Sequence, residues 1–332
     1  MKLSIIVPVY NVELFLEKCI QSVFDQDIPH ETYEIVAVND GSTDNSPAIL
    51  EKLQKTISNL KIIHQDNKGL SGARNSGFDF ATGDYLLCVD SDDYILPNSL
   101  HKLISLAEEH QLDLLEFGAQ GVDEDKNVIY SLAKSSNGKV FTGEQYLTEI
   151  RYMGSACNKL YNRNFLNTHK LRFMEGVYIE DIEFNTRVVF KANKVLATDY
   201  IAAHFLQRLG SITRTKNFAK KEKMIFDIHT VLKSINDFTE NEVTENSSAY
   251  IPLKRRVSSL IATLLIRVLK DSKTTSTKKE IIKKLKEDNL YPTKYEAETK
   301  DKKYFLNFSN IYPLFSIGNF FCSTYNRIRY GK

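Results

Sequence analysis

The chain has 332 residues and a mass of 38.1 kDa, which is too long for one ordinary domain and suits a large domain with an appended region. Its 42% apolar and 26% charged residues describe a globular protein and exclude a disordered, collagen-like or multi-span membrane protein. The formal net charge of +2 conceals an asymmetry, because residues 251–332 contain 18 Lys and Arg against 7 Asp and Glu. The composition predicts an acidic body joined to a basic C-terminal region.

The cysteines are too few and too scattered for a disulfide framework, and no CxxC pair indicates a zinc site. They are Cys19, Cys88, Cys157 and Cys322. The opening MKLSIIVPVYN is interrupted by Pro8 too early for a signal peptide, and no run of about 18 apolar residues is available to span a bilayer. We therefore expect a cytoplasmic protein, with peripheral attachment to the inner face of the cell membrane as a further expectation from the basic region.

Short apolar runs alternate with helical patterns in the first hundred residues. The runs cover residues 2–9, 33–38, 60–64 and 85–89. Each is too short for a helix and too apolar for a half-exposed strand, which indicates buried strands. Helical segments between such strands are typical of βαβ units, so the sequence predicts an α/β fold with a mostly parallel sheet and helices on both faces. The first helix is expected to bury Leu14, Cys19, Ile20 and Val23.

The second half of the chain is less regular and then becomes helical. Strands are predicted at 112–117 and 195–203, and a helix at 180–191. The C-terminal part is expected to contain a helix at 251–270 with the stripe Val257, Leu260, Ile261, Leu264 and Leu265, a loop at 274–277 and a basic helix at 281–290. We expect a sheet-containing domain at 1–216, with halves at 1–111 and 112–216, and a helical region at 217–332.

Polar residues follow the predicted strands at their carboxyl ends, which is where ligands gather in an open parallel sheet. The first run ends in PVYN (8–11), the second in NDGS (39–42) and the fourth in DSDD (90–93). Three carboxylates within four residues repel one another, and ionising them together requires a cation. Mg²⁺ is typically held by one or two carboxylates plus substrate phosphates. The alternative is an acid cluster that caps the helix expected after Pro97.

Two further features at this edge suit a nucleotide. Asp40 can accept hydrogen bonds from a nucleoside, with an Asx turn at Gly41 as the alternative. The segment NKGLSGARN (67–75) contains two glycines and Arg74, a cation for phosphate, but it matches neither a Walker loop nor a GxGxxG fingerprint.

Glu180 and Asp181 begin a predicted helix, where the helix dipole by itself favours acidic residues. The functional interpretation makes one of these carboxylates a general base. His204 is a candidate metal ligand, with an ordinary core or surface histidine as the alternative.

The motifs, in their order, resemble the inverting family-2 glycosyltransferases with the GT-A fold. They are SIIVPVYN, VNDGSTD, NKGLSGARN, VDSDD, EDIEFN and QRLGSIT. The resemblance runs from residue 3 to about residue 213. It implies a Rossmann-like nucleotide-diphospho-sugar transferase sheet, followed here by a helical region that carries no motif of the family.

The resemblance also implies roles for individual residues. The donor-binding set would be Pro8, Tyr10, Asn11, Glu13, Asp40, Ser42, Gly69, Arg74, Asn75, Asp90, Ser91, Arg208 and Ser211. Asp92, with Asp90 and His204, would hold Mg²⁺ or Mn²⁺. Asp181 would be the general base, with Glu180 beside it as an acceptor contact.

The implied reaction moves a sugar from a nucleotide-diphosphate donor to a hydroxyl of a glycan or lipid-linked acceptor, as in bacterial capsule, lipopolysaccharide or exopolysaccharide assembly. By analogy with the family, Asp40 favours a uracil base and hence a UDP-sugar, with GDP- and dTDP-sugars as the alternatives. A sugar-1-phosphate nucleotidyltransferase should have a glycine-rich basic loop where this chain has Val-Tyr-Asn. A non-catalytic sugar-nucleotide scaffold should have lost Asp90, Asp92 or Asp181, and all three are present.

The C-terminal tail contains a helical stripe followed by basic residues. The stripe is Leu314, Ile317, Phe321, Tyr325 and Ile328. Such a pattern is typical of a helix that lies on an anionic membrane, and packing on the preceding helices or on a second subunit is the alternative. The basic region holds no nucleic-acid-reading motif, so nucleic acid is not expected as a partner.

Overall fold

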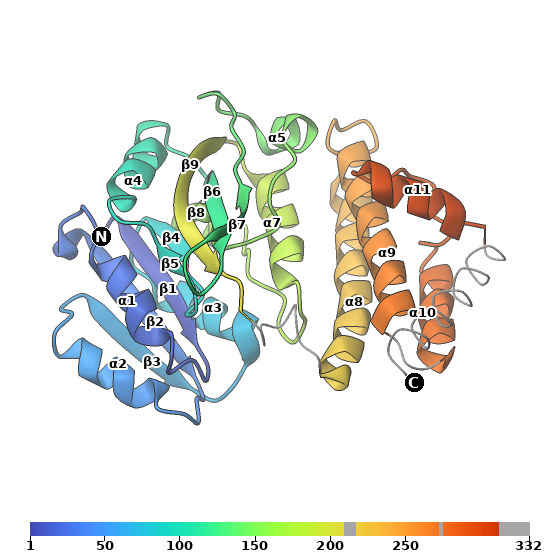
Figure 1. Cartoon of the computed structure of the whole chain (residues 1–332). Coiled ribbons are helices and arrows are strands. Elements are labelled where there is room, and N and C mark those ends of the chain that lie inside the picture. Colours follow the sequence, from blue (N-terminus) through green and yellow to red (C-terminus); the bar gives the residue numbers. More distant parts are fainter. Residues whose placement is uncertain (209–216, 272–274, 312–332) are drawn as a thin grey trace. The chain divides into compact units, whose positions relative to one another are not determined.

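The computed structural model describes residues 1–208, 217–271 and 275–311, and the chain divides into two compact units (Figure 1). The first unit comprises Met1–Gly176 and Glu180–Arg208, and it contains the sheet. The second comprises Val177–Ile179 and Leu209–Lys332. The division expected after residue 216 falls in the gap at 209–216, outside the described residues.

The first unit is built on a mixed sheet with the order β3-β2-β1-β4-β8-β6-β9-β5 among the described residues, and β7 pairs with β6. The strands predicted from the apolar runs are parallel to one another, as expected: β1 (Leu3–Val9), β2 (Tyr33–Asp40), β3 (Leu60–Gln65) and β4 (Tyr85–Cys88). Ile5, for example, lies opposite Ile35 on one side and Leu87 on the other. All seven residues of β1 are buried, which explains the continuous apolar run.

The later strands add antiparallel pairs to the sheet. They are β5 (Tyr94–Ile95), β6 (Leu114–Val122), β7 (Val128–Leu132), β8 (Lys159–Asn162) and β9 (Val195–Leu206). Strand β8 is antiparallel to both β4 and β6, which makes β6 parallel to β4. Strand β9 is parallel to β6 and antiparallel to β5. The carboxyl ends of β1, β2, β4, β6 and β9 therefore face the same way.

Helices cover both faces of the sheet, as predicted (Figure 1). One core lies under α1 (Leu16–Phe24), α2 (Ser46–Gln54) and α4 (Leu100–Glu109), and η1 (His30–Thr32) precedes β2. The other lies under α3 (Gly69–Phe80), α5 (Gly143–Glu149), α6 (Arg163–Thr168) and α7 (Glu180–Lys191). The expectation for Leu14 is wrong: it precedes α1 and is 83% exposed, and Leu16 is buried instead.

The second unit is helical, with α8 (Phe218–Glu242), α9 (Tyr250–Asp271), α10 (Thr275–Glu287) and α11 (Lys300–Ser309). The predicted stripe on α9 is confirmed, because all five of its residues are buried. The loop expected at 274–277 is wrong from Thr275 onward, since α10 begins there. Thr277 is buried and its Oγ1 donates to Glu222, which fixes the first turn of α10.

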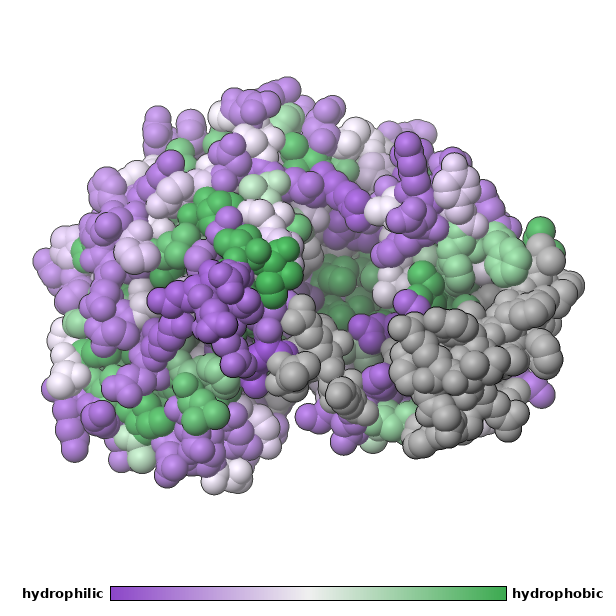
Figure 2. All heavy atoms as spheres, in the orientation of Figure 1, coloured by the Kyte–Doolittle hydropathy of each residue, from purple (hydrophilic) through white to green (hydrophobic). Residues whose placement is uncertain are grey.

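Among the described helices, none combines the length and the apolar character that a membrane crossing requires. On the face drawn in Figure 2, hydrophilic side chains predominate over the sheet-containing unit, with apolar residues in small groups between them. The tail stripe at 314–328 lies outside the described residues.

Candidate active site

Hydrogen bonds tie the loop after β1 to the loop after β2. The backbone N–H of Asn11 donates to Ser42 Oγ (3.2 Å), and Asn11 Oδ1 accepts from the backbone N–H of Thr43 (2.8 Å). Glu13 Oε2 accepts from the N–H of Asn45 (2.9 Å). Asn11 has φ +52°, a conformation that asparagine adopts more readily than most residues. Asn11, Glu13 and Ser42, all from the predicted donor-binding set, thus hold these two loops together at the carboxyl ends of β1 and β2.

Asp40 lies at the end of β2 and is 2% exposed. Its Oδ1 accepts hydrogen bonds from Gln65 Nε2 (2.7 Å) and the backbone N–H of Lys68 (2.8 Å), while Oδ2 takes part in neither bond. The turn that follows is made by Asn39, whose Oδ1 accepts from the N–H of Ser42 (3.1 Å). The side chain in this turn is thus that of Asn39 and not that of Asp40. Asp40 instead connects β2 to the loop before α3.

Four other predicted donor-binding residues lie at the same edge of the sheet and differ in how far they are exposed to solvent. Pro8 is buried within β1 and Ser91 is buried after β4, whereas Tyr10 is 51% exposed. Gly69 begins α3 with φ +76°, a conformation that favours glycine. Of these four, Tyr10 has the side chain most accessible to a ligand.

Arg74 is the central cation of the site and is 3% exposed. Its Nη1 donates to Glu180 Oε1 and its Nη2 to Asp90 Oδ1, each over 2.6 Å. Its Nε is buried and has no hydrogen-bond partner among the described residues. The guanidinium suggested for a phosphate is thus shared by two carboxylates, and it joins the loop after β4 to the start of α7.

Asn75, the next residue, holds the segment before α7. Its Nδ2 donates to the carbonyl of Phe173 (3.0 Å), and its Oδ1 accepts from the N–H of the same residue (2.9 Å). Asn75 therefore acts as a clamp on the backbone in this structure.

Asp181 lies in the first turn of α7, beside the ion pair of Glu180 and Arg74. Burial and the negative charge of Glu180 raise the pKa of Asp181 to about 7, against the opposing effect of Arg74. A carboxylate with a pKa near neutrality suits a general base. Ile179, the residue directly before α7, has φ +60°, which costs a β-branched residue on the order of 1–3 kcal/mol.

The acidic loop after β4 has two kinds of carboxylate. Asp90 and Asp92 are each partly exposed, and burial together with the charge of Asp90 raises the pKa of Asp92. Arg208 Nε donates to Asp92 Oδ2 (2.8 Å). Burial and the charges of Asp90 and Asp92 raise the pKa of Asp93, and its Oδ1 accepts from the backbone N–H of Leu206 at the end of β9 (2.7 Å). Asp93, which the sequence did not assign, ties two elements of the site together.

The donor set of this loop fits a hard divalent cation. Asp90 and Asp92 supply carboxylate oxygens, and their mutual repulsion would be relieved by a positive ion. Among the described residues, no three His, Cys, Asp or Glu side chains are placed to hold a metal together. One or two carboxylates with substrate phosphates are the usual ligands of Mg²⁺, so Asp90 and Asp92, each paired here with an arginine, are the residues that would hold such an ion.

His204 is engaged elsewhere. Its Nε2 lies 3.1 Å from Gln120 Oε1 and its Nδ1 lies 3.4 Å from the Tyr94 hydroxyl, whose ring packs edge-on against it. Burial and the nearby Lys126 lower the pKa of His204, which favours the neutral ring. His204 therefore connects β9 to β6 and β5, and our proposal for the metal uses only Asp90 and Asp92.

The family model described as "Glycosyl transferase family 2" matches residues 4–169, which is half of the chain. The chain belongs to this family. Putative glycosyltransferase EpsH of Bacillus subtilis (strain 168) is 32% identical over 240 residues, which are 70% of this chain and 67% of EpsH. Poly(ribitol-phosphate) beta-N-acetylglucosaminyltransferase TarS of Staphylococcus aureus (strain MW2) is 27% identical over 77% of this chain and 52% of TarS. The resemblance inferred from the motifs is confirmed.

Solved structures match the fold of this family-2 glycosyltransferase. The crystal structure of S. aureus TarS 1-349 in complex with UDP-GlcNAc has a TM-score of 0.61 at 23% identity, over 88% of this chain and 93% of that one. Mannosyltransferase PcManGT from Pyrobaculum calidifontis, in complex with GDP-Man and Mn²⁺, has a TM-score of 0.55 at 12% identity. The match covers 96% of this chain and 87% of that one. The predicted GT-A fold with a C-terminal helical region is confirmed.

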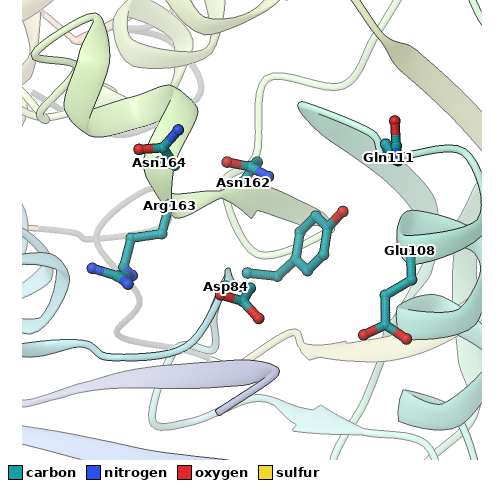
Figure 3. A pocket seen from close by; sticks show the side chains of 7 residues that line it. Asp84, Glu108, Gln111, Asn162, Arg163 and Asn164 are labelled. Atoms are coloured by element: carbon teal, nitrogen blue, oxygen red, sulfur yellow. The ribbon is translucent and has the colours of Figure 1, made fainter.

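Two polar pockets lie at the other end of the sheet. One, of about 410 Å³, is lined by Asp84 and Tyr85 at the start of β4, together with residues of α4 and α6 (Figure 3). In that view, Arg163 and Asn164 lie on one side and Glu108 and Gln111 on the other. The second, of about 380 Å³, includes Tyr33 at the start of β2. Neither contains a residue of the acidic loop or of the α7 start.

Sequence reasoning missed a buried charge network behind the site. Lys159 and Glu116 are both fully buried, with Nζ and Oε2 3.6 Å apart. Glu116 accepts from the N–H of Met153 (3.0 Å) and from the hydroxyl of Tyr146 (3.2 Å). Lys159 donates to the carbonyl of Met153 (2.8 Å). The network fixes the loop before β8, and a single Lys or Glu within an apolar strand is the only signal for it in the sequence.

Proposed function

We propose that this enzyme transfers a sugar from a UDP-sugar to a hydroxyl of a glycan or lipid-linked acceptor, in the assembly of a bacterial surface polysaccharide. The observation that carries the proposal is Asp181, with a pKa of about 7, beside the Glu180–Arg74–Asp90 chain of ion pairs. With Asp181 as the proton acceptor and the loop after β4 as the site of the diphosphate and its cation, this arrangement supports the proposal. Matched structures that contain UDP and UDP-GlcNAc support the choice of nucleotide.

The donor nucleotide is proposed to bind at the ends of β1 and β2. Asp40 Oδ2, which is outside the bonds to Gln65 and Lys68, would accept from the N–H of uracil. Tyr10 is exposed enough to stack on a planar base. The loops that Asn11 and Glu13 tie together would then form a preorganised floor under the nucleoside.

The diphosphate is proposed to lie over the acidic loop. Asp90 and Asp92 would hold Mg²⁺ or Mn²⁺, and such an ion would supply positive charge to neutralise the diphosphate and stabilise the departing nucleotide. Arg208, bound to Asp92, would close over the diphosphate together with Ser211, which lies outside the described residues.

Asp181 would accept the proton of the acceptor hydroxyl as its oxygen attacks the anomeric carbon. The leaving nucleotide departs from the opposite face, so a single displacement inverts the configuration. The proton moves from the hydroxyl to the Asp181 carboxylate, and no covalent sugar–enzyme bond forms. Glu180 is already paired with Arg74, which leaves Asp181 as the base.

The pH dependence of donor turnover tests this assignment. Because only the ionised carboxylate accepts a proton, and the pKa of Asp181 is raised to about 7, the rate should rise with pH through about 7 and then level off. The measurement is UDP release from UDP-GlcNAc with Mn²⁺ between about pH 5.5 and 9, with or without an acceptor. A rate that is constant over this range would remove Asp181 from the role.

The C-terminal region is proposed to bind an anionic membrane surface, where lipid-linked acceptors lie. Tyr304, Phe308 and Ile311 are exposed at helical spacing on and just after α11, close to Lys300 and Lys303. The full chain should co-sediment with phosphatidylglycerol vesicles at low salt and much less with phosphatidylcholine vesicles. Equal recovery with both, or none with either, would reject the proposal, and light scattering would then test for an oligomer.

A further inference from the structure

The three residues that directly precede Glu180 and Asp181 belong to the helical unit. Val177–Ile179 belong to the same unit as Leu209–Lys332, whereas Glu180–Arg208 belong to the unit that contains the sheet. The backbone N–H of Tyr178 donates to Asp227 Oδ2 over 2.8 Å. Asp227 lies on α8, and its side chain is 11% exposed. A carboxylate of the helical unit thus holds the backbone three residues before Asp181.

Lys223 reinforces this contact from one turn earlier on α8. Its Nζ lies 2.5 Å from the same Asp227 oxygen and 4.6 Å from the centre of the Tyr178 ring. The carboxylate is therefore held by a charge-assisted bond, and the ammonium also contacts the aromatic ring. Tyr178 is fixed through both its backbone and its side chain.

The backbone around Tyr178 has a conformation that requires such support. Gly176 has φ +77° and Ile179 has φ +60°. A β-branched residue adopts the left-handed region only where the surrounding structure holds it there. The Asp227 bond supports this segment, and the segment is joined directly to the first residue of α7.

We propose that Asp227 is a positioning residue for the reaction, acting through Tyr178 and Ile179 to hold Asp181 in line with the acceptor hydroxyl. The inference rests on the proposed function of Asp181 as the base. A general base must lie within hydrogen-bond reach of the proton it removes, and a displacement of about 1 Å can cost 10²-fold in rate. In this proposal Asp227 acts only through the backbone that it holds.

The test compares three variants of the full chain. Asp227→Ala removes the acceptor, Asp227→Asn keeps an oxygen for the Tyr178 N–H, and Asp237→Ala is the matched control, since Asp237 pairs with Lys233 on the same helix and is 49% exposed. Two quantities are measured: kcat and KM for UDP release from UDP-GlcNAc with Mn²⁺, and hydrogen–deuterium exchange of peptides that cover 177–183.

Asp227→Ala should lower kcat at least tenfold, leave the donor KM within about twofold, and speed exchange at 177–183. Asp227→Asn should restore most of kcat, and Asp237→Ala should match the wild type. A kcat of Asp227→Ala within twofold of the wild type, or an equal loss in Asp237→Ala, would overturn the proposal. A rise in donor KM with kcat unchanged would also overturn it.

A second variant covers the case in which Asp227→Ala does not fold. Lys223→Met removes the ammonium from a side chain that is 44% exposed, so the helix should tolerate it. It should lower kcat and speed exchange in the same direction by a smaller factor, and wild-type values of both would count against the proposal. If the wild type releases no UDP, the proposed function fails, while exchange in these variants still decides whether Asp227 holds the segment.

Discussion

Replacing Asp181 with Asn is expected to lower the rate of sugar transfer by about 10²–10⁴-fold, the usual contribution of a general base. Asparagine has nearly the same shape as aspartate but cannot accept the proton of the acceptor hydroxyl. Donor binding should be preserved, because the nucleotide is assigned to the ends of β1, β2 and β4. The measurement is the rate of UDP release from UDP-GlcNAc, together with the donor affinity of the same variant.

The same substitution should make the protein more stable above neutral pH. The pKa of Asp181 is raised to about 7 in the folded state, from an ordinary value near 4. Between these two values the folded state holds the proton more tightly than the unfolded state, so stability falls as the pH rises from about 4 to about 7. Asn removes that loss, so Tm at pH 8 should rise. Asp199→Asn, at an exposed carboxylate on β9, is the control and should change neither rate nor Tm. Near-normal turnover in Asp181→Asn would contradict the assignment.

Replacing Arg74 with Gln should have the largest effect on folding. Glu180 and Asp90 would both lose their cation, and breaking a buried pair typically costs about 3–5 kcal/mol. For a unit of this size, that corresponds to roughly 10 °C in Tm. Chemical denaturation monitored by circular dichroism measures the change in the free energy of unfolding.

Lys2→Gln is the matched control for Arg74→Gln. Lys2 pairs with Glu108 over 2.8 Å, but both side chains are 40% or more exposed, so the loss should be no more than about 1 kcal/mol. If the two variants lost similar stability, Arg74 would not be the central ion pair of the site.

Local pattern was sufficient to predict most elements of the sheet-containing unit. The helix expected at 180–191 has those bounds in the structure, because acidic residues at its start and apolar residues at helical spacing act within one segment. Strands β1, β2 and β4 were predicted for the same reason, since their continuous apolar runs reflect burial on both faces. The strand expected at 60–64 forms as β3, but it lies at the edge of the sheet and only its Leu60 is buried, so the expectation of a buried strand is wrong there.

Pairing between distant segments was not predictable in this way. Strand β8 is antiparallel to β4 and β6, yet a buried strand has the same composition whichever way its neighbours run. The bond of Arg74 to Glu180 spans 106 residues, and nothing in either motif names the other as its partner. The resemblance implies a metal role for His204, and nothing in the sequence around it indicates that its ring contacts Gln120 and Tyr94 on neighbouring strands.

Thermal shifts with sugar nucleotides test the proposed donor site most directly. The ligands are UDP-GlcNAc, UDP and GDP-mannose, each with and without Mn²⁺, on the wild type, on Asp92→Ala and on Asp199→Ala as the control. A ligand at a hundred times its Kd stabilises the native state by about 2.7 kcal/mol, which is several degrees in Tm. We predict a Mn²⁺-dependent rise with the uridine nucleotides that Asp92→Ala loses and Asp199→Ala keeps. No rise with any nucleotide in the wild type would contradict a donor site at this edge of the sheet.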